Sequence, residues 1–362
     1  MSLFLCVDCG GTKTAAAIAD VDGKIIGRSF AGPSNITYLT SEGFLVAVTE
    51  AVTAALKAAF PTAPEAAHSL PPIKNPFVAA WFGISGADSP AAIDRVSQLL
   101  SDLLGLPIGP KLTIANDTHL LAAPIRMYPK ASQGVVVIAG TGSIAVSFED
   151  VAGKLEERGR VGGWGWILGD EGSGFDVGKE ALRQLLKAHD ETTITGARLP
   201  QSILIGRILE LFGVNTIMEI LGYVYQPDPV PGARTFQNRT REKRISGLPP
   251  IIFEAAFDNN DPLALTIVKT CAGRLADQIA RLLGDGLEDP ARAVVAAQSV
   301  LSFGGSLVGV EGYRTLIIND LARRGHCFRH AVFVSDAAST GATALASSFS
   351  IQMKPLGDDA HS

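Results

Sequence analysis

The sequence predicts an α/β fold of two domains with a ligand-binding cleft between them. The chain has 362 residues, and at roughly 150 residues per domain this length suggests two domains. Short apolar runs alternate with amphipathic helical stretches, and the order strand, glycine–threonine turn, strand, hairpin occurs twice. With 47% hydrophobic and 19% charged residues, the composition excludes a disordered chain.

The first unit is predicted to hold three strands, a helix, a strand, a helix and a last strand. Asp22-Gly23 is a hairpin turn signal, and Ser41 is suited to cap the first helix. The prolines of residues 61–76 predict a loop, and Pro90 suits the first turn of the second helix. The predicted strands are residues 3–8, 15–20, 24–30, 77–84 and 112–115, and the predicted helices are 41–59 and 89–104.

The second unit repeats the strand pattern and then becomes mostly helical. The spacing from the turn threonine to the hairpin lysine is similar in both units, from Thr12 to Lys24 and from Thr141 to Lys154, which indicates a duplicated unit. Predicted strands are 134–139, 144–148, one through 155, 300–303 and 331–334, and predicted helices are 175–188, 201–212, 217–225 and 262–283. Residues 226–250, rich in proline and basic residues, are predicted to be a long loop.

We therefore expect residues 1–129 to form an N-terminal α/β domain, with the helix at 338–350 as a candidate addition to it. Residues 130–337 are expected to form a larger C-terminal α/β domain. A ligand between two such domains would lie in the cleft that separates them.

Charge and cysteine content narrow the class of protein. The net charge is -5 and lysines and arginines form no long run, so nucleic acid is not expected as a partner. No apolar stretch is long enough for a membrane span, and the first apolar run, interrupted by Asp8, does not read as a signal peptide. Four cysteines, with Cys6 and Cys9 the only C-x-x-C pair, fit the reducing cytoplasm. We expect thiols buried in the core or at a loop edge rather than a metal site.

The first motif that could carry chemistry is DCGGTKT at residues 8–14, in a turn between two strands. Glycines let backbone N–H groups approach phosphate oxygens, and threonine hydroxyls add donors. Asp8, at the end of the strand, is suited to hold Mg²⁺, usually through water. The spacing is not that of a Walker A loop, and the alternative is a plain hairpin turn.

Two further motifs follow strands. Gly140-Thr141-Gly142-Ser143 is the partner turn of the second unit, and two such turns suit a nucleotide whose phosphates are held from both sides. Asn116-Asp117 follows the strand at 112–115, where an aspartate could accept a proton from a substrate hydroxyl. The alternative for Asp117 is a helix N-cap, and for the glycine motif a turn.

The most distinctive motif is GGWGWILGDEGSG at residues 162–174. Tryptophan faces pack against the C–H surface of sugars, and carboxylates accept hydrogen bonds from sugar hydroxyls. An ordinary loop before a helix N-cap is the alternative. The sequence contains no G-x-S-x-G motif, no dinucleotide-binding fingerprint and no H-E-x-x-H motif.

Together these motifs resemble the superfamily of sugar kinases, Hsp70 and actin, and more closely the N-acetylglucosamine kinases of the BadF/BadG/BcrA/BcrD ATPase family. The resemblance runs along nearly the whole chain through VDCGGTKT (7–14), GPSN (32–35), GISGAD (83–88), ANDT (115–118), AGTGS (139–143), the 162–174 motif, FGGSL (303–307) and the small residues of 337–346. It implies a two-domain actin-like ATPase fold, a duplicated ribonuclease H-like unit with an interdomain cleft. It also implies phosphorylation of N-acetyl-D-glucosamine at its 6-hydroxyl by ATP with Mg²⁺, and a homodimer.

The resemblance also implies a role for individual residues. Asp117 would be the catalytic base and Asp8 would position the metal. The ATP site would comprise Gly10, Gly11, Thr12, Lys13, Gly140, Thr141 and Gly142 around the phosphates, and Ser246, Gly304, Gly305 and Ser306 around the adenosine. The sugar site would comprise Asn35, Asn116, Asp117, Ser143, Gly163, Trp164, Gly165 and Asp170.

Three other functions stay open on sequence alone. The first is a kinase for a related hexose: glucosamine, N-acetylmannosamine, muramic acid or glucose. The second is an ATPase that activates a redox partner protein, and the third is a sugar sensor without catalysis. Production of ADP that depends on a sugar would separate the kinases from the other two.

Overall fold

The computed structural model contains two five-stranded sheets with the same strand order. It describes residues 2–128, 130–228, 236, 239–284 and 294–353. The order is β3-β2-β1-β4-β5 in the first sheet, and β8-β7-β6-β9-β10 in the second, read in the matching direction. In each sheet the first three strands pair antiparallel and the last two add in parallel. The duplicated unit predicted from the sequence is thus confirmed.

The first sheet and its helices follow the predicted order closely. Ser89 caps α2 by accepting the Ala92 N–H, and Gly105 ends that helix in the left-handed conformation at φ 63°. The strands are β1 (Leu3–Cys9), β2 (Thr14–Ala19), β3 (Ile25–Ala31), β4 (Phe77–Ile84) and β5 (Leu112–Asn116). The helices are α1 (Ser41–Ala59), α2 (Pro90–Leu104) and α3 (Thr118–Leu121), with 3₁₀ turns at Glu65–His68 and Ala123–Met127.

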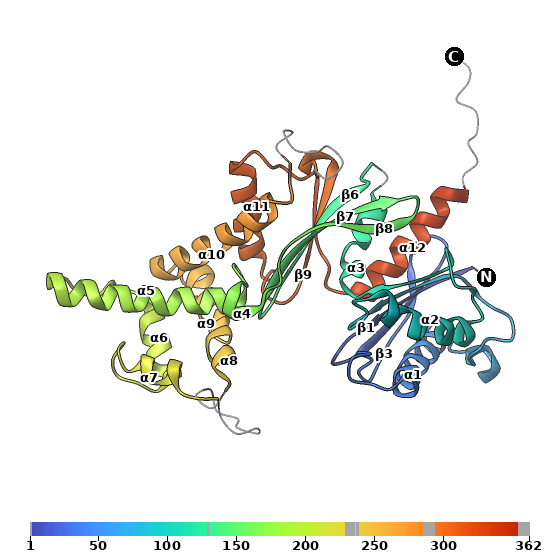
Figure 1. Ribbon diagram of the computed structural model, residues 1–362, viewed down its shortest axis with the longest axis horizontal. Helices are drawn as coiled ribbons and strands as arrows, with labels where there is room; N and C mark the ends of the chain where they lie inside the picture. The colour runs from blue at the N-terminus through green and yellow to red at the C-terminus, as the bar shows by residue number, and fades with distance from the viewer. Residues whose placement is uncertain (1, 129, 229–235, 237–238, 285–293, 354–362) are drawn as a thin grey trace, which may run out of the picture.

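The second sheet carries many more helices on one of its faces (Figure 1). Its strands are β6 (Gln133–Ala139), β7 (Ser143–Val151), β8 (Lys154–Gly162), β9 (Ser299–Gly304) and β10 (His330–Phe333). Its helices are α4 (Gly165–Leu168), α5 (Gly174–Thr195), α6 (Ile203–Phe212), α7 (Ile220–Tyr225), α8 (Arg241–Ser246), α9 (Pro249–Phe253), a π-helical turn (Glu254–Asp258), α10 (Pro262–Ala280), a 3₁₀ turn (Ala296–Gln298), α11 (Glu311–Arg323) and α12 (Ala337–Met353).

Three buried cores alternate with the two sheets. Both faces of β1 and of β6 are covered, which explains their continuous apolar sequences. The first core lies between the first sheet and helices α1 and α2, and the third lies between the second sheet and helices α5 to α11. The middle core contains residues of both sheets together with α3 and α12. The last helix, α12, therefore packs inside the molecule between the two units (Figure 1).

The cysteine pair lies on opposite faces of β1. Cys6 belongs to the middle core and Cys9 to the first core, and both side chains are fully buried. Burial raises the pKa of both thiols. Because the two sulfurs point away from each other, the C-x-x-C spacing does not bring them together.

The predicted loop at 226–250 is partly wrong. Arg241–Ser246 forms α8, capped by the Thr240 hydroxyl, and α9 begins at Pro249. Proline at the start of α9 favours a helix there, because the first helical N–H has no intrahelical partner. Residues 229–235, 237 and 238 of this segment lie outside the described residues. The helix predicted at 175–188 extends from Gly174 to Thr195, where Gly196 ends it.

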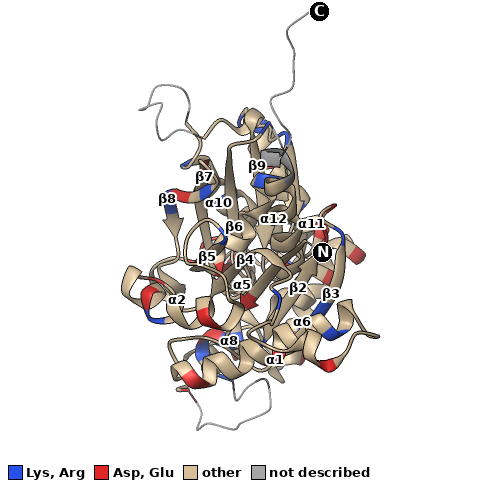
Figure 2. Cartoon of the chain, turned by 90° about the vertical axis from the view of Figure 1, so that its right-hand side faces the viewer, with Lys and Arg blue, Asp and Glu red and all other residues tan. Residues whose placement is uncertain are grey.

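Two other observations concern possible partners. Among the residues that the structure describes, no helix is long and apolar enough to cross a membrane. On the face shown in Figure 2, basic and acidic residues are interspersed over the outer helices and do not gather in one patch.

Candidate active site

Asp8 and Asp117 lie at the same edge of the first sheet, where parallel strands β1 and β5 end. Burial raises the pKa of Asp8 to about 6, and the negative charges of Asp117 and Asp336 add to this rise, while Lys13 opposes it. Burial likewise raises the pKa of Asp117. The two carboxylates are thus near neighbours in a partly desolvated position, which is typical of functional sites.

A chain of hydrogen bonds connects Asn35 to Asp117. Asn35 Nδ2 donates to Ser85 Oγ at 3.0 Å, and the Ser85 hydroxyl bonds to Asp117, which lowers the pKa of that carboxyl against the effect of burial. Asn35 Oδ1 in turn accepts the Thr37 N–H at 2.7 Å. The predicted sugar residue and the predicted base are therefore held by the same serine, which the sequence analysis did not single out.

Asn116 has a different neighbour. Its Nδ2 donates to Asp88 Oδ1 at 2.7 Å, and its Oδ1 accepts the Thr118 N–H at 2.9 Å. Asp117 occupies the N-cap position of α3 but its side chain makes no capping bond. The carboxylate of Asp117 is held by the Ser85 hydroxyl and by nearby backbone N–H groups, whereas the Asn116 side chain bonds Asp88 and Thr118.

Asp336 is a further carboxylate of this cluster that sequence reasoning missed. It follows β10 of the second sheet and accepts hydrogen bonds from Ser339 N and Oγ at the start of α12. It also forms an ion pair with Arg28 Nε of β3 at 2.7 Å. An aspartate two positions after a predicted strand was the available signal, at the same offset as Asp117 after the predicted strand 112–115.

The first glycine turn is open to solvent. The Gly10 N–H donates to Lys13 O at 3.0 Å, and Gly11, Thr12 and Lys13 are exposed. The Lys13 ammonium lies 4.7 Å from the centre of the Phe30 ring. Backbone donors and the Thr12 hydroxyl of this turn are accessible to a phosphate.

The second glycine turn is held by helix α5 and by Asp170. The Gly174 and Phe175 N–H groups donate to Gly140 O and Thr141 O at 2.8 and 3.1 Å. Asp170 Oδ1 accepts the Ser143 N–H at 3.0 Å.

Asp170 is 6% exposed and adopts a left-handed φ of 63°, a strained conformation for aspartate. A Cβ at Gly142 would lie 2.8 Å from the Asp170 carboxylate, so this turn requires glycine. The predicted sugar residue Asp170 thus contacts the second turn directly, and Ser143 Oγ donates to Glu171 O at 2.8 Å beside it.

A buried ion network supports the 170–174 loop from behind. Arg274 Nη1 lies 3.0 and 3.1 Å from the two oxygens of Asp176, and Arg274 Nη2 lies 2.8 Å from Glu180 Oε2. Asp176 Oδ2 accepts the Gly172 N–H at 2.9 Å, and the Tyr313 hydroxyl donates to Gly172 O at 2.9 Å. These contacts fix the loop that carries Asp170.

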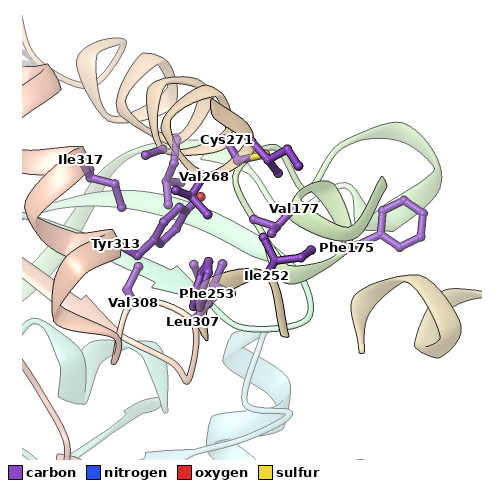
Figure 3. Packing of buried hydrophobic residues seen from close by; sticks show 14 of the residues in the cluster. Phe175, Val177, Ile252, Phe253, Val268, Cys271, Leu307, Val308, Tyr313 and Ile317 are labelled. Carbon is purple, nitrogen blue, oxygen red and sulfur yellow. The ribbon is translucent and has the colours of Figure 1, made fainter. Parts of the chain in front are cut away.

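A pocket of about 450 Å³ opens beside the second turn. Four of the predicted nucleotide residues, Gly140, Thr141, Ser246 and Ser306, line it. The rest of the lining was not predicted from the sequence: an apolar wall of Pro249, Pro250, Phe253, Phe257, Leu307 and Val310, and the acidic Glu254 and Asp258. Two residues of this wall, Phe253 and Leu307, lie side by side in Figure 3. The size and the lining suit a nucleoside.

Gly304 and Gly305 border the same turn from β9. Gly305 adopts a φ of 98°, and a Cβ there would lie 2.5 Å from Ala139 O. The Leu307 N–H donates to Ala139 O at 3.0 Å. Glycine is thus required for the close approach of the β9 loop to the end of β6.

The remaining predicted sugar residues are exposed. Gly163, Trp164 and Gly165 precede or begin α4, and Trp164 is 61% exposed. The Gly163 N–H donates to Ser143 O at 3.0 Å, which ties this segment to the second turn. Among the described residues, no hydrogen bond joins Trp164 or Asp170 to Asn35 or Asp117.

A second hollow, of about 440 Å³, lies between the two units. Asn116, Asp88 and the start of α2 form one wall, and the β8 residues Leu155 and Glu157 form part of the other. The predicted residues thus fall into two groups, one at the end of each sheet, with an interdomain hollow beside the first group.

Two sheets of equal topology, each with a glycine turn at the end of its first strand, define a two-lobed nucleotide-binding protein. The chain belongs to the BadF/BadG/BcrA/BcrD ATPase family, whose model matches residues 5–322.

Similar proteins include an N-acetylmuramic acid/N-acetylglucosamine kinase from Clostridium acetobutylicum, 28% identical over 276 residues, or 76% of this chain and 77% of that protein. An N-acetyl-D-glucosamine kinase from Dictyostelium discoideum is 28% identical over 277 residues, or 76% of this chain and 78% of the relative. A Porphyromonas gingivalis protein, provisionally named an N-acetylglucosamine kinase, has a solved structure of the same fold. That structure has a TM-score of 0.58 at 20% identity and covers 96% of this chain and 99% of its own. These likenesses confirm the predicted family and the two-domain fold.

Proposed function

We propose that this protein is an amino-sugar kinase that transfers the γ-phosphoryl group of ATP to the 6-hydroxyl of N-acetyl-D-glucosamine. The observation that carries the proposal is the position of Asp117. Its carboxylate stands at the end of β5, bonded to the Ser85 hydroxyl that also holds Asn35, and its pKa is raised. The names of the two relatives at 28% identity support the choice of an amino sugar.

Asp117 would orient the sugar hydroxyl and accept its proton. The sugar oxygen forms a bond to the γ-phosphorus, the bond from that phosphorus to the β-γ bridging oxygen breaks, and ADP leaves. A carboxylate with a raised pKa is a stronger base than an exposed one, which favours proton transfer near neutral pH. Because the transition state is loose, positioning and charge balance supply most of the catalysis.

Asp8 is the residue suited to hold Mg²⁺ at this site. Burial raises the pKa of Asp8 and the charges of Asp117 and Asp336 raise it further, so a divalent cation would relieve repulsion already present in the chain. Mg²⁺ usually takes one or two carboxylates together with substrate phosphates. When bound, the ion supplies positive charge that offsets the phosphate oxygens.

The nucleotide would occupy the pocket beside the second turn. Thr141 and the backbone of 140–142 would contact phosphates, while Phe253, Phe257 and the prolines of α9 would cover the base. Gly10, Gly11, Thr12 and Lys13 would reach the phosphates from the first sheet. Since the two turns belong to different sheets, this arrangement requires the units to close over ATP, which would also exclude water.

The sugar would lie between the two groups of residues. Asn35 and Asp117 would contact it from the first unit, and Asp170, Ser143 and the 163–165 segment from the second. Trp164 is free to cover a sugar face, as its exposure permits. We also propose a domain boundary near 129/130, a homodimer and a cytoplasmic location.

The decisive test measures ADP release with Mg-ATP and a panel of hexoses, with a control that contains no sugar. Release that requires N-acetylglucosamine supports the proposal. Release with glucosamine, N-acetylmannosamine, muramic acid or glucose alone would keep the kinase and Asp117 but change the substrate. Release that is independent of sugar would contradict the kinase and favour an ATPase that acts on a protein partner.

A further inference from the structure

A third pocket lies on the outer side of helices α5, α7 and α8. Its volume is about 330 Å³, within the range of small-molecule sites. Its floor is apolar and includes Phe175, Leu182, Leu186 and Val224. None of the residues described above as sugar or phosphate contacts lines it, so it is distinct from the proposed active site.

Every charged residue that lines this pocket, among the described residues, is basic; Tyr225 and Trp166 add one hydroxyl and one indole N–H. Lys179, Arg183 and Arg241 line it, and no acidic side chain does so among the described residues. Each of the three has a carboxylate partner, but every partner is shared with another arginine. Arg183 Nη1 lies 3.9 Å from Glu180 Oε2, and Arg241 Nε lies 3.6 Å from Asp228 Oδ1, which also pairs with Arg244 at 3.9 Å.

Arg274 takes up the remaining acidic charge near Lys179 and Arg183. It pairs with Asp176 at 3.0 Å, closer than Lys179 does at 3.4 Å, and with Glu180 at 2.8 Å. Basic groups therefore outnumber carboxylates around a largely apolar pocket.

We propose that this pocket binds a small amphipathic anion, a carboxylate with a medium-length alkyl chain, and that its occupancy changes nucleotide affinity. The chain would fill the apolar floor, and the carboxylate would meet Arg183 and Arg241 in a charge-assisted, two-pronged contact. Burial of alkyl carbons supplies affinity, and the basic residues select the sign of the head group.

The coupling follows from two helices that reach both pockets. In α5, Gly174 N–H holds Gly140 of the nucleotide turn, while the next residue, Phe175, lines the outer pocket. In α8, Ile245 lines the outer pocket and Ser246 lines the nucleotide pocket. The helices touch closely, because a Cβ at Gly178 would collide with Ile245 O. A ligand that shifts α5 against α8 thus acts on the nucleotide turn, and linkage makes the effect reciprocal.

The test uses decanoate below its aggregation concentration, with binding and ADP affinity both measured by calorimetry. We expect one decanoate per chain and a dissociation constant about three- to fourfold weaker for each methylene removed. Decyltrimethylammonium, which has the same chain and the opposite charge, should not bind. Saturating decanoate should change the ADP dissociation constant at least threefold.

Three variants make the assignment specific. Arg183→Glu with Arg241→Glu should weaken decanoate binding at least tenfold, and Val224→Trp, which fills the floor, should abolish it. Arg281→Glu is the matched control, because Arg281 is exposed and does not line the pocket. ADP should bind all three variants in the absence of decanoate.

Equal binding of decanoate to the double variant, or equal binding of decyltrimethylammonium, would overturn the site. An unchanged ADP affinity in the presence of bound decanoate would overturn the coupling. If decanoate fails to bind the dimer but binds a monomeric variant, the proposed ligand site is also overturned, since a second copy of the chain would then cover the pocket. Since the readout is binding, these outcomes are independent of which sugar the protein phosphorylates.

Discussion

Arg274 in α10 spans both carboxylate oxygens of Asp176 in α5, 98 positions earlier in the sequence, at 3.0 and 3.1 Å. The same guanidinium also bonds Glu180 one turn further along α5. Asp176 and Glu180 are both buried, so one arginine neutralises two carboxylates that would otherwise repel each other. Through the Gly172 N–H, this network determines where the loop with Asp170 lies.

We predict that Arg274→Met lowers the free energy of unfolding by about 3 kcal/mol, because it leaves two buried carboxylates with only the longer ion pairs to Lys179 and Arg183. Urea denaturation measures the change. The control is Arg323→Met, whose side chain is 75% exposed and should cost less than about 0.5 kcal/mol. Adding Asp176→Asn and Glu180→Gln to Arg274→Met should recover part of the loss, and no recovery would argue against the charge explanation.

Asp117→Asn is expected to lower kcat by at least about 10²-fold, the usual effect of removing a general base. The sugar KM should change little, because asparagine keeps an oxygen for the Ser85 hydroxyl. Steady-state ADP release provides the measurement. Asp102→Asn, an exposed change in α2, is the control. Near wild-type turnover in Asp117→Asn would contradict the assignment of Asp117 as the catalytic base.

Two substitutions at Asp170 separate its support of the turn from its contact with sugar. Asp170→Asn keeps the oxygen that accepts the Ser143 N–H but replaces the second oxygen by a donor. We expect the sugar KM to rise at least tenfold and the ATP KM to stay within twofold. Asp170→Ala loses both functions and should raise both constants. Equal changes of the two constants in Asp170→Asn would contradict a sugar contact.

Phe257→Ala should raise the ATP KM about tenfold and leave the sugar KM unchanged, since the ring forms part of the nucleotide pocket wall. Phe349→Ala is a matched control: this half-buried ring packs against Phe4, 5.6 Å away, outside that pocket. A similar ATP KM in both variants would show that the adenine base of ATP does not bind against Phe257.

Asp8 makes stability depend on pH. Its pKa of about 6 in the folded state exceeds the 3.8 of an unperturbed aspartate, so the folded state binds the proton more tightly. The contribution of Asp8 to stability therefore falls as pH rises from about 4 to about 6. Asp8→Asn should be more stable than the parent at pH 7.5, by about 3 kcal/mol, and equal to it near pH 4. Thermal unfolding at several pH values, with exposed Asp22→Asn as control, measures this; a constant difference across pH would contradict it.

Much of the architecture was predictable because its signals are local. The two glycine turns, the apolar runs of β1 and β6 and the prolines that begin helices all act within a few residues. Asp117 could be found for the same reason, as a polar residue directly after a strand.

The missed parts of the site depend on contacts between distant segments. The wall formed by Phe253 and Phe257 exists only once α9 and the π-helical turn pack beside the 140–142 turn. Residues 241–246 were predicted to be a loop because the helix they form is short. Asp336 approaches Asp8 across more than three hundred positions. The hydrophobic pattern of a helix does not indicate which distant segment it will contact, so these contacts can be seen only in the folded chain.

The place of α12 in the middle core has a consequence for biosynthesis. Its Gly341 packs so closely on Cys6 that a Cβ there would collide with the Cys6 sulfur. The first sheet is made early, yet the helix that covers one of its faces is made last. At 5–20 residues per second the ribosome needs roughly 20 to 70 s to pass from β1 to α12. During that interval the nascent chain presents an uncovered apolar face, a ready substrate for chaperones that bind exposed hydrophobic segments.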